Sequence, residues 1–297
     1  MALIKAARQA EAAENFAAAF EAWTRLALEA GRADFYCQVA RVAAELERWV
    51  DAEEAFLGAL KVDSRFSNAM LGIGLLFLTR TDGDQTANAK VANLWLLRAL
   101  EIDRTAVALG LLGAAYYRLG EKKAAKEAFR AAIKADRSYD EAYFNLGILV
   151  AEDGDETEAE GLLRKAIQLD PCFLAAHGRL GILLQKQGRH REAESEFRRC
   201  TEIDPSDYFS HLYLADSLRI EGREVEAERE YRKAISIRPG DAPALNLFAD
   251  YLESLSRKEE ANQLRAQLSP NAPLSGQRPR NRENRWTIRT FSKFDRN

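Results

Sequence analysis

The sequence repeats itself with a period of about 34 residues, a length typical of stacked helix-turn-helix units. Two small residues and a proline recur at this interval, as Gly147, Ala166 and Pro171, then Gly181, Cys200 and Pro205, then Ala215, Ala234 and Pro239. In such arrays each unit packs only against its neighbours. The sequence therefore predicts an all-α chain that grows along one axis.

The spacing within residues 140–173 explains why the pattern predicts helix pairs. Gly147 and Ala159 are small because the two helices of a pair approach each other at these positions. Tyr143 and Leu163 are large and stand at helical spacings beside them, so they fill the remaining space. The prolines disfavour a continuous helix from one unit to the next, because proline lacks a backbone donor and restricts the residue before it.

We expect about eight units in residues 1–270. They start near residues 1, 33, 67, 106, 140, 174, 208 and 242. The third unit contains an insertion near 79–89, which should lengthen its inner turn at little entropic cost. The last unit becomes polar near its end, as expected of the capping unit that such arrays need.

Charge is distributed unevenly along the chain. The net charge is only −3, which does not favour nucleic acid as a partner. The C-terminal segment, residues 271–297, carries seven basic and two acidic residues and is rich in Pro, Ser and Asn, so it should be disordered alone. It also contains four large apolar residues, Trp286, Ile288, Phe291 and Phe294.

The sequence offers no sign of a membrane or secreted protein. Lys5, Arg8 and Glu11 interrupt the N-terminal stretch where a signal peptide needs an apolar run. No window approaches the roughly 18 to 20 apolar residues that span a bilayer. Three scattered cysteines form no disulfide framework, and we therefore expect a cytoplasmic protein.

Residues that could carry out chemistry have structural explanations. His177 and His211 stand where Tyr143 stands in its own unit, which indicates core packing rather than metal binding. No zinc-ligand spacing is present, and Gly72-Ile73-Gly74 lacks the third glycine of a dinucleotide fingerprint. We expect no metal, no cofactor and no enzymatic activity.

The repeated unit resembles the tetratricopeptide repeat (TPR) family. The matching residues in the fifth unit are Tyr143, Leu146, Gly147, Val150, Ala159, Leu163, Ala166 and Pro171. The resemblance implies a right-handed superhelix that acts as a protein-interaction scaffold and binds a peptide or helix in its concave groove. No specific member of the family is indicated.

In the TPR family, fixed positions of each first helix line the groove. Carried onto this chain, these positions select Leu71, Leu75, Leu111, Tyr117, Arg118, Phe144, Asn145, Ile148, Arg179, Ile182, Lys186, Phe209, Leu212, Tyr213, Asp216 and Arg219. Gly72, Gly110 and Gly178 fall among them and would leave pockets. The apolar character favours a segment with apolar anchors. Alternatively, these side chains only pack against neighbouring units.

Some co-chaperone TPR domains bind a C-terminal carboxylate with five polar residues. Asn145 and Arg179 match two of these, but Gly110, Ala114 and Ala175 stand at the other three positions. The sequence therefore does not favour a carboxylate clamp.

Two other functions remain open. The C-terminal segment could dock on a partner or membrane surface, fold back into its own groove or a neighbour's, or be a passive end. In the docking cases the protein would be a regulatory or assembly factor, and an oligomer is possible. By family analogy alone, the chain could also be an accessory subunit of an enzyme such as a glycosyltransferase.

Overall fold

The computed structural model describes residues 2–267, and within them every regular element is a helix. Eight helices begin a pair: α1 (Ala2–Ala12), α3 (Ala33–Glu45), α5 (Ser67–Thr79), α7 (Ala106–Arg118), α9 (Asp140–Glu152), α11 (Leu174–Lys186), α13 (Tyr208–Ile220) and α15 (Ala242–Ser254). Eight complete a pair: α2 (Phe16–Ala30), α4 (Trp49–Val62), α6 (Gln85–Ile102), α8 (Lys122–Ala135), α10 (Glu156–Leu169), α12 (His190–Ile203), α14 (Glu224–Ile237) and α16 (Lys258–Arg265). The predicted all-α fold is confirmed.

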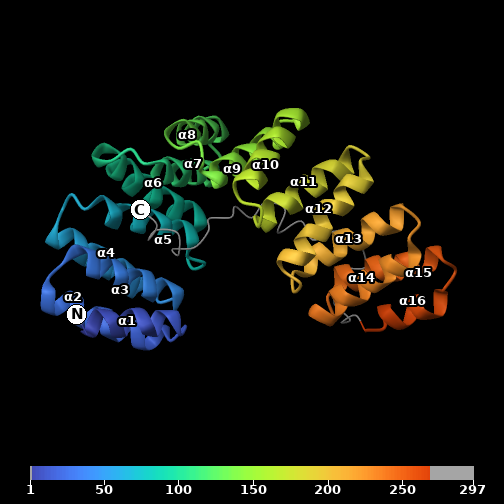
Figure 1. Ribbon diagram of the computed structural model, residues 1–297, viewed down its shortest axis with the longest axis horizontal. Helices are drawn as coiled ribbons and strands as arrows, with labels where there is room; N and C mark the ends of the chain where they lie inside the picture. Colours follow the sequence, from blue (N-terminus) through green and yellow to red (C-terminus); the bar gives the residue numbers. More distant parts are fainter. Residues whose placement is uncertain (1, 268–297) are drawn as a thin grey trace. The chain divides into compact units, whose positions relative to one another are not determined.

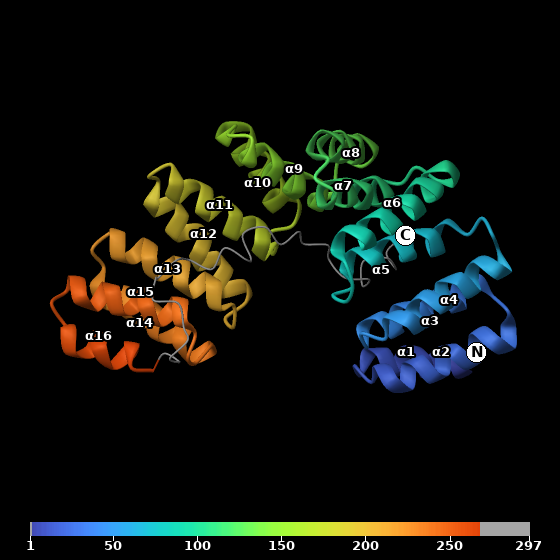
Figure 2. The same ribbon diagram turned by 180° about the vertical axis from the view of Figure 1, so that it is seen from behind.

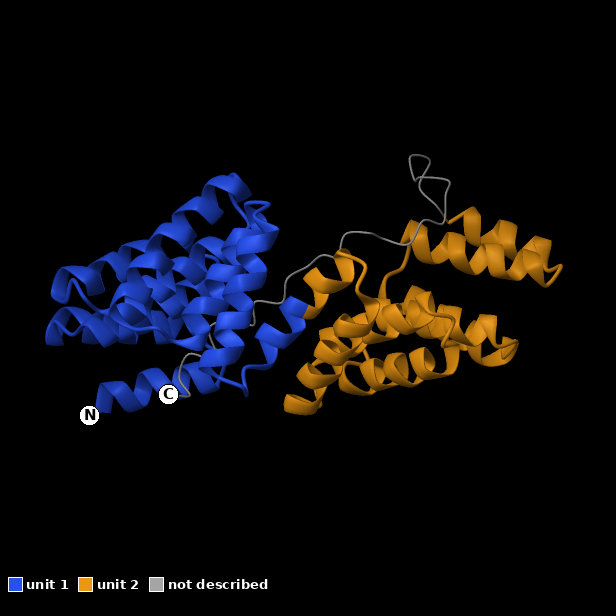
Figure 3. Cartoon of the chain, turned by 90° about the horizontal axis from the view of Figure 1, so that it is seen from above, with its two compact units in different colours: residues 1–146, 287–297 blue, residues 147–286 orange. Residues whose placement is uncertain are grey.

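The described chain divides into two compact units, residues 2–146 and 147–267, and the division falls within α9 (Figure 3). In the first unit, α1 packs on α2, α3 on α4, α5 on α6 and α7 on α8 (Figures 1 and 2). Each pair also contacts the next, through α2 with α3, α4 with α5 and α6 with α7. The second unit is built in the same way, as α12 with α13 shows. Both units are therefore stacks of helix pairs.

Within a pair, an aromatic ring of the second helix lies on a glycine of the first. A Cβ atom added at Gly181 would stand 2.6 Å from Cε1 of Phe197, and one at Gly113 would stand 2.8 Å from Cε1 of Phe129. Both rings are fully buried. Burial of one such side chain contributes about 1.5–3 kcal/mol, so the glycine recurs because it admits the ring.

A short turn with one left-handed residue joins the two helices of most pairs. Gly120 holds this position between α7 and α8 with φ of +80°. Gly154, Gly188 and Gly222 hold it in the following three pairs. Glu47 holds the same position between α3 and α4 with φ of 56°, although it has a side chain. This backbone conformation is costly for residues other than glycine.

The predicted insertion in the third pair is only partly a loop. Residues 80–84 connect α5 to α6, and the remaining extra residues lie in α6, which is 18 residues long. Asp84 caps α6 by accepting a hydrogen bond from the Thr86 amide, and Arg80 pairs with Asp82 at 2.6 Å. The cap starts the helix early, so the insertion lengthens the helix as well as the turn.

Pockets were predicted at three glycines, but side chains fill the space at two of them, Gly72 and Gly110. A Cβ atom at Gly72 would stand 2.2 Å from the Phe56 ring, and one at Gly110 would stand 2.6 Å from the Tyr139 ring. The Phe56 ring comes from α4, and the Tyr139 ring comes from the turn between α8 and α9. The prediction of pockets at Gly72 and Gly110 is therefore wrong, because a ring of the preceding repeat fills the space at Gly72 and a ring of the turn before α9 fills the space at Gly110.

In the second unit, arginines at the start of three second helices connect successive pairs. Arg189 contacts Glu160 of the preceding pair at 2.6 Å and Glu192 of its own helix at 2.7 Å. Arg223 makes the same contacts one repeat later, with Glu194 and Glu226. Arg257 makes them again in the last pair, with Glu228 and Glu260. We call these contacts the arginine ladder.

Candidate functional site

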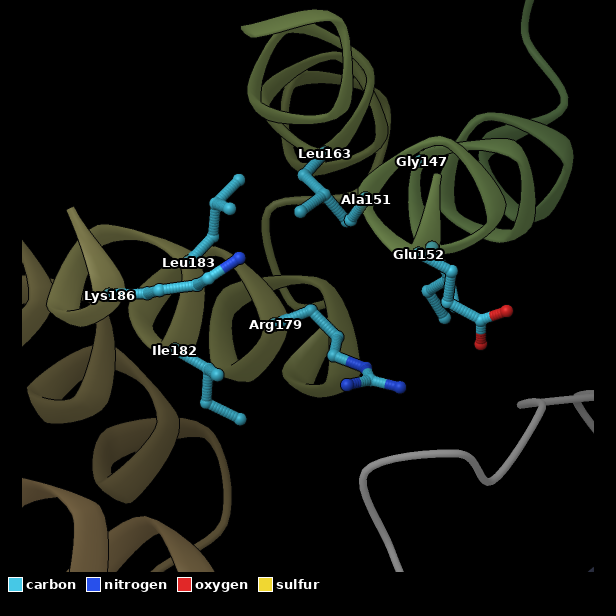
Figure 4. A pocket seen from close by; sticks show the side chains of 9 residues that line it. Gly147, Ala151, Glu152, Leu163, Arg179, Ile182, Leu183 and Lys186 are labelled. Atoms are coloured by element: carbon cyan, nitrogen blue, oxygen red, sulfur yellow. The ribbon is translucent and has the colours of Figure 1, made fainter. Parts of the chain in front are cut away.

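A pocket of about 180 Å³ opens between α9 and α11 in the second unit (Figure 4). Side chains from α9, α10 and α11 line it. The lining residues are Gly147, Ile148, Ala151, Glu152, Leu163, Arg179, Ile182, Leu183 and Lys186.

The floor of the pocket is apolar. Ile148, Leu163 and Leu183 are buried there, with 5%, 2% and 6% of their surfaces exposed. Gly147 keeps the floor close to α10, since a Cβ atom added to it would stand 3.3 Å from Cγ of Leu163. Ala151 is small and half-buried, so it leaves space where a longer side chain would fill the pocket.

Charged side chains stand around this floor. Arg179 and Glu152 both line the pocket (Figure 4). Arg179 is half-buried, and Glu152 is exposed. The ammonium of Lys186 lies 2.6 Å from the Glu156 carboxylate. Its hydrogen bond, together with its charge, holds the pKa of Glu156 below the usual range despite partial desolvation. The pocket thus combines an apolar interior with a polar rim.

Four of the sixteen residues selected from the sequence line this pocket: Ile148, Arg179, Ile182 and Lys186. Sequence reasoning missed Gly147, Ala151, Glu152, Leu163 and Leu183. Ala151 could have been found, because it stands two repeats before Arg219, which is at a groove position. An alanine at a position where another repeat has a long side chain is the sequence signal of a pocket.

The residues of α13 that the sequence analysis assigned to the groove interact mainly with other residues of the second compact unit. Tyr213 stacks on Phe197, with ring centroids 5.2 Å apart. Arg219 donates to Asp216 at 2.8 Å, and the guanidinium of Arg238 lies 5.6 Å from the Phe209 ring centre. Leu212 is buried. These contacts order the surface of α13, while the open space lies beside α11.

The selected residues of the first unit are mostly buried. Leu71, Leu75 and Leu111 expose 5% or less of their surfaces. Tyr117 is half-buried. Arg118 is also half-buried and donates to Oε1 of Gln85 at 3.0 Å, and burial lowers its pKa.

Phe144 and Asn145 lie in the N-terminal half of α9. Phe144 is 1% exposed and Asn145 5% exposed. Within the described chain, Oδ1 of Asn145 has no hydrogen-bond partner. An unsatisfied buried acceptor is unfavourable for the stability of the fold.

The two core histidines bridge the helices of their pairs. Nδ1 of His177 lies 2.6 Å from Glu196, and its Nε2 lies 3.2 Å from the Pro171 carbonyl oxygen. His211 makes the equivalent contacts with Glu230 at 2.7 Å and Pro205 at 3.1 Å. Residues 2–267 contain no cluster of three or more side chains suited to a metal ion.

Two further predictions concern the rest of the chain. No helix among the described residues is both long and apolar enough to cross a bilayer. The predicted docking residues Trp286, Ile288, Phe291 and Phe294 lie outside the described residues.

Comparison with known proteins gives a consistent family. Two models of the tetratricopeptide repeat match residues 111–171 and 150–213. No curated protein sequence matches the chain. The solved structure of Pseudomonas aeruginosa pilF is similar with a TM-score of 0.60 and 24% identity, over 69% of this chain and 90% of that chain. The C-terminal part of a TPR repeat-containing protein from Cytophaga hutchinsonii is similar with a TM-score of 0.58 and 16% identity, over 81% and 98%. At these identities the structures show a common fold.

Proposed function

Because the chain is a tetratricopeptide repeat protein, we propose that it binds an apolar side chain of a partner protein in the pocket between α9 and α11. Repeats of this type generally form non-catalytic interaction scaffolds. The bound segment would be a peptide or helix that presents one large apolar residue to Ile148, Leu163 and Leu183.

The pocket itself is the observation that supports this function. Its volume of about 180 Å³ compares with the ~150 Å³ of an engineered apolar cavity that binds benzene. One side chain of the size of leucine or phenylalanine therefore fits. Its burial would contribute about 1.5–3 kcal/mol, which corresponds to roughly 10- to 100-fold in affinity.

The rim would orient the bound segment. Arg179 can donate hydrogen bonds to main-chain carbonyls or to a carboxylate of the ligand, and Glu152 can accept from its amides or pair with a base. A few polar groups around an apolar interior are the usual composition of a specific binding site.

The proposal is tested by filling the pocket. A random peptide library selected against the full chain should enrich segments with a large apolar residue. Ala151→Phe should lower the affinity of an enriched peptide at least 10-fold, because the new ring occupies the pocket. Arg179→Ala should lower it less, because a rim contact is lost while the interior remains. Isothermal titration calorimetry measures both effects.

Val225→Phe provides a matched control, since residue 225 is 85% exposed on α14 and does not line the pocket. It should leave affinity unchanged. Phe144→Ala is unsuitable, because removing a fully buried ring costs about 3–5 kcal/mol of stability. Equal affinity of the wild type and Ala151→Phe would show that the pocket is not the binding site.

A further inference from the structure

The second unit is acidic, and the acidity is concentrated beside the pocket. Residues 147–267 contain 24 acidic and 17 basic residues, a net charge of −7. Residues 152–160, at the end of α9 and the start of α10, contain six acidic residues and no basic one. Glu152 belongs to this run and lines the pocket, which Arg179 and Lys186 also line. One side of the pocket therefore favours a ligand with basic residues near its apolar anchor.

The chain contains a segment with this chemistry. Residues 286–294, WTIRTFSKF, place Arg289 and Lys293 between large apolar residues. Residues 271–297 have a net charge of +5, opposite in sign to that of the second unit. We call residues 286–294 the aromatic segment.

We propose that the aromatic segment docks intramolecularly in the pocket between α9 and α11 and competes there with the partner. This inference rests on the proposed function, because it assigns a regulatory ligand to the same pocket. One apolar side chain of the segment occupies the interior, and the positive charges of Arg289 and Lys293 lie close to the acidic run at residues 152–160.

The connecting chain is long enough for this contact. The last described residue, Gln267, belongs to the same unit as the pocket, and residues 268–285 separate it from Trp286. An extended chain of this length reaches about 60 Å. From α16, the pocket beside α11 is about three packed helix layers away, or roughly 30 Å at 8–10 Å per layer. The segment can therefore reach the pocket without strain.

Tethering makes even a weak contact effective. A short flexible linker gives an effective concentration on the order of 1 mM. At this concentration, a segment whose dissociation constant is about 0.1 mM in isolation would make the occupied pocket about ten times as populated as the empty pocket. A competing peptide would bind roughly 10-fold more weakly than it binds to an open pocket.

The test uses the full chain and a labelled synthetic peptide of residues 284–297. The triple variant Trp286→Ser, Phe291→Ser, Phe294→Ser removes the anchors from the chain's own segment. The peptide should bind this variant about 10-fold more tightly than the wild type, and adding Ala151→Phe should abolish the gain. Leu274→Ser, which changes an apolar residue outside the aromatic segment, should behave like the wild type.

Hydrogen exchange and light scattering separate the possible outcomes. In the triple variant, amides of residues 147–152 and 179–186 should exchange several-fold faster than in the wild type. Equal peptide affinity and equal exchange would overturn the inference, as would a wild-type dimer that becomes monomeric in the variant, since the segment would then dock between copies. The proposed function is judged separately, because peptides from the random library must still lose affinity on Ala151→Phe.

Discussion

Some buried residues of the repeat pattern both fill the core and connect two parts of a helix pair, and His211 is an example. His211 fills the core position that Tyr143 fills in its own pair, and it also connects α14 to the turn before α13. Both of its ring nitrogens face oxygen acceptors. A doubly protonated imidazole satisfies both contacts, whereas the neutral ring can donate to only one.

The stability of this contact should depend on pH. Burial disfavours the charged ring of His211, but the Glu230 hydrogen bond, the Pro205 carbonyl and the Glu230 charge outweigh burial and the nearby Lys233, so its pKa is raised above 6.5. The His211 hydrogen bond lowers the pKa of Glu230. The contribution of His211 is therefore fully present below pH ~6.5 and is lost as pH rises through its raised folded-state pKa.

We expect His211→Gln to lower the free energy of unfolding by about 1.5–3 kcal/mol near pH 5.5, the range for hydrogen bonds to charged groups, and by less near pH 8.5. Urea unfolding followed by circular dichroism at both pH values measures the difference. Glu230→Gln should reduce the pH dependence in the same way. An equal loss of unfolding free energy at the two pH values would contradict a stabilising contact that depends on the protonation of His211.

At the scale of helices, the sequence predicted more of the fold than of the site. The helix pairs follow from residues such as Gly181 and Phe197, because a ring fits only where the facing residue has no side chain. The helical part of the insertion was missed, since the Asp84 cap acts through local backbone geometry. The pocket was missed because Ala151 and Leu183 become neighbours only when α9 packs beside α11.

The turns within helix pairs allow a direct test of local backbone strain. Glu47 is exposed and holds a left-handed conformation with φ of 56°, so Glu47→Gly should stabilise the protein by about 0.5–1 kcal/mol. Gly120→Ala should destabilise it by about 1 kcal/mol. A Cβ atom at Gly120 meets nothing within 4 Å, so this effect would come from the backbone alone. Thermal unfolding measures both changes, and opposite signs are required.

At the scale of the molecule, stability is the sum of contributions from each pair and from each contact between neighbouring pairs. The arginine ladder supplies such contacts at three successive positions of the second unit, through Arg189, Arg223 and Arg257. Exposed ion pairs are individually weak and are screened by salt. Their effect should therefore appear when all three are removed.

We expect the triple variant Arg189→Ala, Arg223→Ala, Arg257→Ala to increase hydrogen exchange in residues 147–267 and to leave residues 2–146 unchanged. Its difference from the wild type should shrink in about 1 M NaCl, where charges are screened within a few ångströms. The matched control, Arg25→Ala, removes an exposed ion pair with Glu29 inside α2. An equal rise in exchange in residues 2–146 and residues 147–267 would show that the ladder does not couple the pairs of the second unit.

The three contacts of the ladder are interchangeable. Each arginine reaches a glutamate 29 residues before it, so neither partner distinguishes one neighbour from another. Loss of residues 189–222 would place Arg223 opposite Glu160, a pair of the same kind. The second unit can therefore be shortened or lengthened by whole repeats with its charges still matched, whereas a change of any other length would misalign them.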